Sequence, residues 1–521
     1  MIVFDVVLEL SRAPLLAGIP NCICATSANF GRLGLQAWVN RRPLQTFVEL
    51  ANDDTQHAVI DQVDRFSSQW NLGAVKVRTR MIDLAMVYPS RVKETTGEEL
   101  LYSPLALAYL ARHTPPHYRV SAYDEYVGAD FDPDRVHADV VAVSAITPGI
   151  TRAYAIADRL RHRGIKTIVG GAHASALPDE ALQHFDSVCV GEGEGPWKQF
   201  LQDFERGSIQ QIYRGRMDVP LDGLRTPRRD LIHPNYQYPS VMTSRGCPHG
   251  CSFCYLTVFP NRKYRTIPHD TVLWDLDSLR DPGIVIVTDE NFIGYSEADV
   301  EDRKALLERM IRRRYKFYWG CQASTKLASE PELMDLMYRA GCRAVFLGFE
   351  AIDKEGLAQI NKGHNIGLDY EQVVARLHEH KLAVIASTIY GLDSHGSDYP
   401  DKLIAALRRC KADFPRVFFA TAWPGTPFYA ALEKEGRTCQ NWDEVRKDLP
   451  SIQFKNFSHE EAIVGRKKVL DAFFNLANMS RTIARWAPRE RSLVATYVKM
   501  VVRNRIAEAM KSRRSYVSMG A

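Results

Sequence analysis

Residues 243–255, TSRGCPHGCSFCY, decide how the rest of the chain is interpreted. They place Cys247, Cys251 and Cys254 in a CxxxCxxC array. The intervening glycines and proline allow the chain to loop tightly, so three thiolates can face one side of a metal cluster. Three ligands on a four-iron cluster leave one iron open to another molecule, unlike the four cysteines of an electron carrier.

Zinc is the alternative metal, because it also binds thiolates. A structural zinc site needs four ligands, usually as two separated pairs, and the nearby fourth candidate, His249, lies inside the loop. Ten cysteines in 521 residues are too dilute for a disulfide scaffold. The other seven are scattered, and a CxC pair at Cys22 and Cys24 lacks a nearby third ligand. We therefore expect free thiols in a reducing compartment.

The cysteine stretch ends the first strand of a long alternation of strands and helices. The segments GIVIVTDENF, FYWGCQAS, AVFLGFEA, AVIASTIYGL and RVFFATAWP are predicted strands, separated by helices with amphipathic spacing. This pattern predicts a partial (β/α)6-type TIM barrel over residues 239–430. Its active site is expected at the carboxyl ends of the strands.

A second alternation precedes the barrel. Residues 81–207 alternate Val-, Ile- and Ala-rich strands with helices, which predicts a Rossmann-like domain that binds its ligand at the carboxyl ends of the strands. Residues 208–238 look like a linker, and residues 1–80 like a small α/β extension of unknown role. The fold class is therefore α/β, with a helical, basic region over residues 431–521.

Charge and hydropathy exclude several classes of protein. The 67 basic and 62 acidic residues give a net charge of +5, too small to indicate a nucleic-acid partner. No apolar run reaches the roughly 18 residues of a membrane span. The start carries Asp5 and no basic segment typical of a secretory signal, so we expect a cytoplasmic protein.

The tail is the exception to this even charge balance. Between Arg466 and Arg514 there are thirteen Lys or Arg residues and three acidic residues, interleaved with apolar ones. One interpretation is a solvated basic face on helices that pack on the barrel. The other is peripheral contact with an anionic membrane surface or a lipid-like substrate.

The array with Phe253 before its third cysteine resembles the radical S-adenosylmethionine (SAM) superfamily. GGAHASALPDE at residues 170–180 and CVGEGE at 189–194 resemble the end of the cobalamin-binding domain in cobalamin-binding radical SAM enzymes. The resemblance extends from residue 81 to near residue 440. The cysteine motif is specific for the superfamily. The cysteine motif and the two upstream motifs together say little about the substrate.

The resemblance implies a 4Fe–4S cluster on Cys247, Cys251 and Cys254 whose open iron binds SAM. It also implies six contacts with SAM: Phe253 and Tyr255 near the adenine, Asp289, Glu290 and Asn291 along the methionine end, and Glu350 at the polar groups. Each acidic residue has a structural alternative. Asp289 and Glu290 could cap the loop that follows them, and Glu350 could belong to a buried salt bridge.

The resemblance further implies cobalamin in the Rossmann-like domain. The implied contacts are Tyr102, Ser103, Pro104, Gly170, Gly171, His173, Gly191, Glu192 and Gly193. Gly170 and Gly171 would let the backbone approach a flat cofactor closely. The DxHxxG motif that supplies a histidine to cobalt is missing from the sequence, and His173 lies in a different motif. Cobalamin without a histidine ligand is therefore implied, although some related proteins keep this domain without binding cobalamin.

The implied activity is a cobalamin-dependent radical methyltransferase acting at an unactivated carbon of a small-molecule or lipid-like substrate. In that chemistry a 5′-deoxyadenosyl radical removes a substrate hydrogen and methylcobalamin supplies the methyl group, with electrons from a reductant such as flavodoxin or ferredoxin. The first alternative is a cyclase or oxidase with the same cofactors, as in anaerobic tetrapyrrole ring formation. A methylthiotransferase acting on RNA would need a second cysteine-bound cluster, and a cobalamin or redox sensor would need no open iron. Cys321 and Cys342 are either buried small residues or extra reactive thiols.

Overall fold

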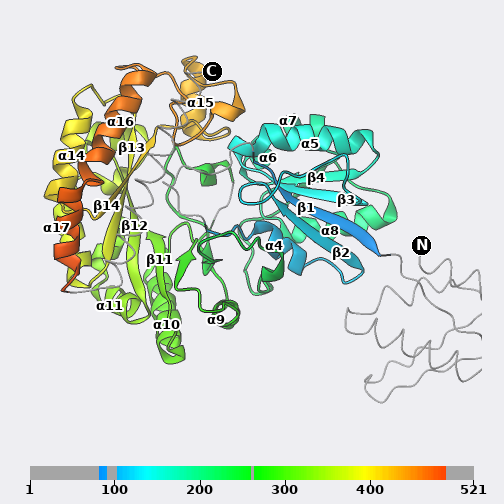
Figure 1. The fold of residues 1–521 in the computed structure, drawn as a ribbon, viewed down its shortest axis with the longest axis horizontal. Helices are drawn as coiled ribbons and strands as arrows, with labels where there is room; N and C mark the ends of the chain where they lie inside the picture. Colours follow the sequence, from blue (N-terminus) through cyan, green and yellow to red (C-terminus); the bar gives the residue numbers. More distant parts are fainter. Residues whose placement is uncertain (1–80, 91–101, 260–262, 489–521) are drawn as a thin grey trace, which may run out of the picture. The chain divides into compact units, whose positions relative to one another are not determined.

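The computed structural model describes residues 81–90, 102–259 and 263–488 (Figure 1). The expected extension over residues 1–80, with Cys22 and Cys24, lies outside the described residues. So does the tail beyond residue 488.

The first domain is a six-stranded parallel sheet in the order β2-β1-β3-β4-β5-β6. Its strands are β1 (Ile82–Tyr88), β2 (Tyr118–Asp124), β3 (Val140–Ser144), β4 (Lys166–Gly170), β5 (Ser187–Val190) and β6 (Ile212–Arg214). Both faces of the sheet are apolar and buried. The strand order reverses between β1 and β3, and ligands of such sheets bind at that point. The predicted Rossmann-like fold is confirmed.

Helices cover both faces of this sheet (Figure 1). One face carries α4 (Ala106–Arg112) and α8 (Glu194–Arg206), and the other carries α5 (Ile150–His162), α6 (Ala172–Ala176) and α7 (Pro178–His184). The edge strand β6 lies within the range that the sequence assigns to a linker. Three residues are too few to give an alternating pattern, and the strand is recognisable only through its pairing with β5.

The second domain is a parallel sheet in the order β14-β13-β12-β11-β10-β7. Its strands are β7 (Ser240–Val241), β10 (Ile284–Val287), β11 (Tyr318–Ala323), β12 (Cys342–Glu350), β13 (Ala383–Tyr390) and β14 (Phe414–Phe419). Helices α10 (Glu297–Arg313), α11 (Pro331–Arg339), α13 (Tyr370–Glu379) and α14 (Tyr399–Arg409) connect them. The expected six-stranded partial barrel is confirmed, while α9 (His269–Asp277) and α12 (Lys354–Gln359) were not predicted.

The sequence suggested that the cysteine loop continues directly from a barrel strand, but in the structure it does not. The barrel strand β7 ends at Val241, and the chain then enters β8 (Ser244–Arg245), which pairs antiparallel with β9 (Arg265–Thr266). The cysteines lie between β8 and β9. A separate two-stranded hairpin therefore holds both ends of the loop.

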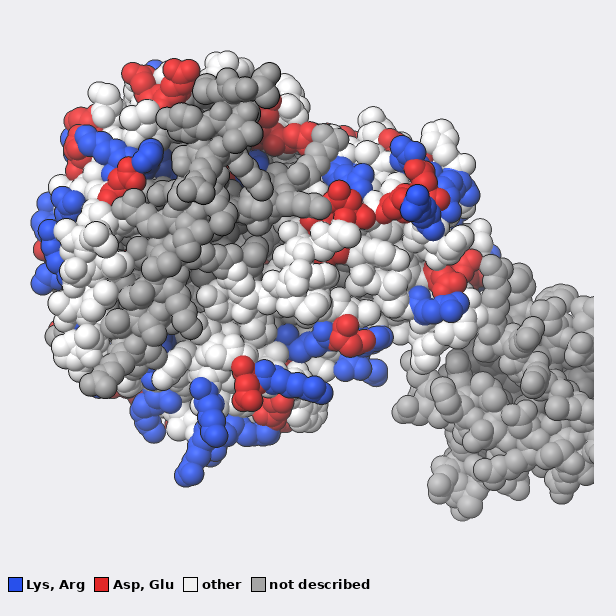
Figure 2. Space-filling model, viewed as in Figure 1, with Lys and Arg blue, Asp and Glu red and all other residues white. Residues whose placement is uncertain are grey.

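The described part of the basic tail packs on the barrel. It forms α16 (His459–Phe473) and α17 (Leu476–Trp486), and Trp486 packs on Ala383 and Phe414 at the amino ends of β13 and β14. Its charges are largely paired: Lys467 with Asp471, Lys468 with Asp401 and Arg485 with Asp413. On the face in Figure 2, basic and acidic side chains are interspersed. These pairs support the packed interpretation, and membrane contact gains no support from them. None of the described helices combines the length and apolarity needed to cross a membrane.

Candidate active site

The cysteine loop is anchored at the carboxyl ends of the barrel strands. The Ser252 amide donates to the Ile360 carbonyl at 2.9 Å, and the Asn361 side chain donates to the Gly250 carbonyl at 2.7 Å. On the other side, the amide of Phe428, in α15 (Pro427–Lys434), donates to the Ser252 carbonyl at 3.0 Å. Segments after β12 and β14 thus hold the loop in place.

The three thiols of this loop form no disulfide, and they lie near enough to affect one another's pKa. Cys251 is buried, and Cys247 and Cys254 are half-buried. Burial raises the pKa of Cys251, and burial raises the pKa of Cys254 to about 12, with the neighbouring thiols adding to both shifts. Buried thiols of this kind become thiolates when a metal compensates their charge. The donor set therefore fits an iron–sulfur cluster.

A single zinc ion fits this site less well. Within residues 81–90, 102–259 and 263–488, no three His, Cys, Asp or Glu side chains are placed to hold one metal ion. Thiols that bind different irons of a cluster lie farther apart than ligands of one ion. His249, the possible fourth zinc ligand, instead stacks on His364 with ring centroids 3.9 Å apart. Burial, with His249 and Lys362 nearby, lowers the pKa of His364 to about 4.

Glu350 and Lys362 form a buried ion pair beside the thiols. The Lys362 ammonium lies 3.3 Å from the Glu350 carboxylate, and the two residues are 9% and 7% exposed. Burial acts to lower the pKa of Lys362, but Glu350 and the thiols of Cys251 and Cys247 outweigh it, so the pKa is raised. Glu350 sits at a β-bulge with a φ of 65°, and such backbone strain in a non-glycine residue is concentrated at functional sites. The pair is a buried, charged anchor for polar ligand groups.

Two of the three candidates after β10 hold the structure together. Asp289 accepts from the Thr243 amide at 2.7 Å, from the Ser244 hydroxyl at 2.7 Å and from the Thr243 hydroxyl. Asn291 donates to the Gly294 carbonyl and accepts from the Ser324 amide. Both are buried, and these contacts support the structural alternative for Asp289, while SAM contact stays a prediction for both residues. Glu290 differs, because it is half-buried and accepts from the Gly246 amide next to Cys247, at 3.0 Å.

We expect Asp289→Asn to lower the free energy of unfolding by about 3–5 kcal/mol, because it breaks a buried network that includes the guanidinium of Arg303. Denaturant unfolding of the reconstituted protein measures this loss. The exposed Glu308→Gln on α10 is the matched control and should change it by less than about 0.5 kcal/mol. Unchanged stability with weakened SAM binding would return Asp289 to the ligand site.

The aromatic candidates lie on either side of the loop. Phe253 packs on the apolar cluster that contains Ile389 and Phe428. Tyr255 is 43% exposed, and its hydroxyl lies close enough to Glu290, Cys254 and Tyr102 for their charges to affect its pKa. Tyr102 belongs to the Rossmann-like domain and is 47% exposed. The structure therefore brings Tyr102, Tyr255 and Glu290 together at the mouth of the site.

Two glycines of the Rossmann-like domain, Gly171 and Gly191, are required by the protein's own backbone. A Cβ on Gly171, where φ is 109°, would lie 2.3 Å from the Ala145 carbonyl oxygen, and one on Gly191, where φ is 90°, would lie 2.5 Å from that of Gly215. A Cβ on Gly170 would make an ordinary contact, and one on Gly193 would press on Leu110 at 3.1 Å. These positions shape the turns at the strand ends, and their contact with a cofactor stays a prediction.

Two other predicted contacts, His173 and Ser103, are engaged within the protein. His173 is fully buried, with Nδ1 3.2 Å from the Thr147 hydroxyl and Nε2 3.3 Å from Glu180. These contacts hold the imidazole ring in place within the domain. A contact of His173 with the cofactor stays a prediction. The buried Ser103 hydroxyl lies 3.2 Å from that of Ser240 and ties the domain to β7.

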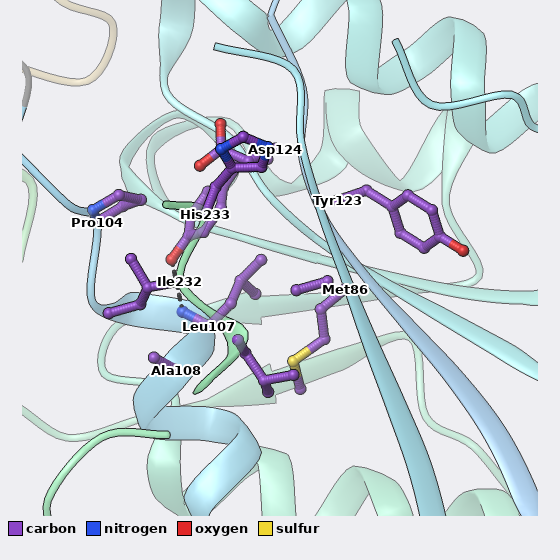
Figure 3. A pocket seen from close by; sticks show the side chains of 11 residues that line it. Met86, Pro104, Leu107, Ala108, Tyr123, Asp124, Ile232 and His233 are labelled. Carbon is purple, nitrogen blue, oxygen red and sulfur yellow. Dashed lines mark hydrogen bonds between the residues drawn. The ribbon is translucent and has the colours of Figure 1, made fainter. Parts of the chain in front are cut away.

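Pro104 lines a small cavity between α4, β1 and β2 (Figure 3). Its acidic residue, Asp124, already accepts a hydrogen bond from Tyr236 at 2.6 Å. The cavity is lined by Tyr88 and Asp124, the last residues of β1 and β2. It therefore reaches the carboxyl ends of these two strands.

At that reversal point the structure exposes a residue that sequence reasoning missed. Ile146 follows β3 and is 53% exposed. A large apolar side chain open to solvent at a strand end suits a large, flat, apolar cofactor. The signal available in the sequence was an isoleucine directly after a buried strand. Lys362 and Arg245 were also missed, because their partners lie far away in sequence.

Two further predictions concern Glu192 and the scattered cysteines. The Glu192 carboxylate forms an ion pair with Arg265, and its contact with a cofactor stays a prediction. Cys321 and Cys342 are buried in the barrel core, and burial raises the pKa of Cys321. Packing is the role that their position supports.

Two family models match the chain. Residues 241–422 match the Radical SAM superfamily, and residues 99–201 match the B12 binding domain. Bacteriochlorophyllide d C-12(1)-methyltransferase of Chlorobaculum tepidum is 28% identical over 384 residues, which is 72% of this chain and 81% of that protein. Hopanoid C-2 methylase of Rhodopseudomonas palustris is 27% identical over 344 residues, 64% of this chain and 65% of that protein.

Two more distant relatives add a solved structure with a similar fold and a protein that is named for a different reaction. The structure of TsrM from Kitasatospora setae, a radical SAM methyltransferase with cobalamin and a [4Fe-4S] cluster bound, aligns with a TM-score of 0.59 and 17% identity over 82% of this chain and 99% of that chain. That likeness concerns the fold. Anaerobic magnesium-protoporphyrin IX monomethyl ester cyclase of Rubrivivax gelatinosus is 24% identical, over 56% of this chain and 58% of that protein.

Proposed function

We propose that this chain, which belongs to the cobalamin-binding radical SAM enzymes, transfers a methyl group to an unactivated carbon of a small or lipid-like molecule. Its two matched domains imply a 4Fe–4S cluster, SAM and cobalamin. When bound, these groups supply hydrogen-atom removal and a methyl group, while the protein orients them and excludes solvent. The observation that carries the proposal is the set of three thiols at the carboxyl ends of the barrel strands, on a loop joined to the B12 binding domain.

In this proposal Cys247, Cys251 and Cys254 hold the cluster. Lys362 and Glu350 anchor the charged groups of SAM, because they form a buried ion pair beside the thiols. Glu290 fixes the start of the loop through the Gly246 amide and leaves its carboxylate at the mouth of the site. Phe253 and Tyr255 supply apolar surface for the adenine.

Cobalamin in this proposal lies at the carboxyl edge of the Rossmann-like sheet, against Tyr102 and Ile146. Both side chains are exposed there. His173 gives the cofactor no ligand, because both of its ring nitrogens already face protein oxygens. The proposal is therefore cobalamin without a histidine ligand from this residue.

The substrate class follows from the named relatives. A bacteriochlorophyllide methyltransferase and a hopanoid methylase both act, by name, on large apolar ring systems. We propose a substrate of that kind, together with a small electron-transfer protein such as flavodoxin or ferredoxin as reductant. The cyclase relative favours the same cofactors with ring formation as a second candidate reaction.

Anaerobic reconstitution with iron, sulfide and cobalamin, followed by incubation with methyl-labelled SAM and polycyclic candidate substrates, tests the function. We expect 5′-deoxyadenosine and a labelled product. Formation of 5′-deoxyadenosine with an unlabelled, cyclised product would favour the cyclase. Bound cobalamin without any SAM cleavage would favour a sensor and overturn the enzyme proposal.

A further inference from the structure

Two arginines and two glutamates form a buried cluster between the two matched domains. We call Glu192, Glu194, Arg245 and Arg265 the arginine–glutamate clamp. The glutamates lie in the B12 binding match and the arginines in the Radical SAM match. The clamp therefore links the two domains through charged groups.

The contacts within the clamp are bidentate. Arg245 Nη1 and Nη2 donate to the two carboxylate oxygens of Glu194 at 3.1 and 2.6 Å. Arg265 Nη1 donates to Glu192 at 3.0 Å, and its Nη2 donates to the other oxygen of the same carboxylate. Arg245 also lies 3.6 Å from Glu192, so the two pairs form one network.

The clamp is shielded from water. Its four side chains are between 8% and 20% exposed. The Arg245 guanidinium also lies over the Tyr109 ring, 5.5 Å from the centroid. A planar guanidinium makes two parallel hydrogen bonds and stacks on an aromatic face, which a lysine ammonium does not do. The geometry is therefore specific to arginine.

Each end of the clamp lies beside a cofactor element. Arg245 ends β8 and is two residues before Cys247, and it pairs with Arg265 across the hairpin that bounds the cysteine loop. Glu192 lies in the turn after β5, where Gly191 and Gly215 approach too closely for any Cβ. Because both ends are stiff, a shift of the β5 turn moves the start of the cysteine loop.

Stability alone is a weak reason for such a cluster. A buried ion-pair network stabilises a fold no better than well-packed apolar residues of similar volume. It does fix one relative placement of its partners, because a displaced pair leaves buried charges uncompensated. The clamp thus fixes one position of the cysteine loop relative to the edge of the Rossmann-like sheet.

We propose that the clamp is a positioning device that couples the two cofactor sites, so that cobalamin on the sheet edge strengthens SAM binding at the cysteine loop. This inference rests on the proposed function. By linkage, SAM must strengthen cobalamin binding by the same factor. Arg245 and Arg265 act in it as positioning residues, through the loop that carries the thiols.

The test measures the affinity of the anaerobically reconstituted full chain for SAM with and without hydroxocobalamin, by equilibrium dialysis. In the wild type we expect cobalamin to tighten SAM binding at least about fivefold. Arg245→Lys keeps the positive charge but loses the bidentate hydrogen bonds. In this variant the ratio of SAM affinities with and without cobalamin should fall to about one, while the protein still binds both SAM and cobalamin.

Two further variants complete the design. Glu192→Gln removes the charge that pairs with Arg265, so it should reduce the ratio. It leaves the Arg245–Glu194 pair in place, so it provides a second test if Arg245→Lys folds poorly. Arg119→Lys is the matched control, because Arg119 makes a similar forked contact with Asp83 on the surface of the same sheet. It should leave the ratio unchanged.

Two results would overturn the coupling while leaving the proposed function intact. One is a wild type with cluster and cobalamin bound whose SAM affinity is the same with and without cobalamin. The other is a wild-type affinity ratio in both Arg245→Lys and Glu192→Gln. A wild type that takes up neither iron nor cobalamin would instead overturn the proposed function, and the coupling with it. Iron and cobalamin contents, measured on every variant, separate these results.

Discussion

Replacing Cys251 by alanine should abolish assembly of the iron–sulfur cluster and reduce SAM cleavage at least about a thousandfold, a barrier increase of about 4 kcal/mol. Cys251 is the central and most buried thiol of the loop, at 6% exposed. Two remaining thiolates do not hold three irons of a cluster. Iron and sulfide contents, the visible absorption of the reconstituted protein and the yield of 5′-deoxyadenosine measure the loss.

Cys410→Ala is the matched control for this variant. Cys410 is also buried, but it follows α14 and contacts the Leu407 carbonyl at 3.3 Å. Its replacement should leave iron content and cleavage near the wild-type values, at a modest cost in stability. A Cys251→Ala protein that keeps its chromophore and still cleaves SAM would remove the cluster from this loop.

Much of the fold could be predicted because its signals are local. The strands β12 and β13 are long, largely apolar runs, and α13 between them shows amphipathic spacing. Such periodicity depends on neighbours within one element. The same holds for the cysteine array, whose three thiols are close in sequence.

The contacts of the charged residues could not be predicted in the same way. Asp289 accepts from residues 45 and 46 positions away, and Arg245 meets a glutamate 51 positions away. Sequence order alone does not decide whether a carboxylate at a strand end faces a ligand or a neighbouring loop. The short strands β6, β8 and β9 escaped for a related reason, because only their pairing distinguishes them from loops.

The surroundings of the glycines show the same limit. Gly170 and Gly171 were interpreted as places where a cofactor approaches the backbone. In the structure a Cβ on Gly171 would meet the Ala145 carbonyl oxygen, and one on Gly191 would meet that of Gly215. These neighbours lie far away in sequence, so sequence order could not identify them, and the cofactor contact stays a prediction.

Lys362→Met should lower the free energy of unfolding by about 3–5 kcal/mol, because it leaves the Glu350 carboxylate buried without its ammonium partner. The double variant Lys362→Met with Glu350→Gln should recover most of that loss, since neither group is then charged. Denaturant unfolding of the two variants gives the comparison. Lys468→Met, which removes an exposed pair with Asp401, is the control and should change little.

The double variant also separates folding from ligand binding. If Lys362 and Glu350 anchor the charged groups of SAM, the stable double variant should still assemble its cluster but bind SAM at least about tenfold more weakly, a loss of about 1.4 kcal/mol. Equilibrium dialysis on the reconstituted protein measures that affinity. A double variant with wild-type stability and wild-type affinity would show that the pair only joins β12 to the loop after α12. The left-handed backbone of Glu350 would then be a consequence of the β-bulge, and the SAM anchor would have to lie elsewhere, with Glu290 as the next candidate.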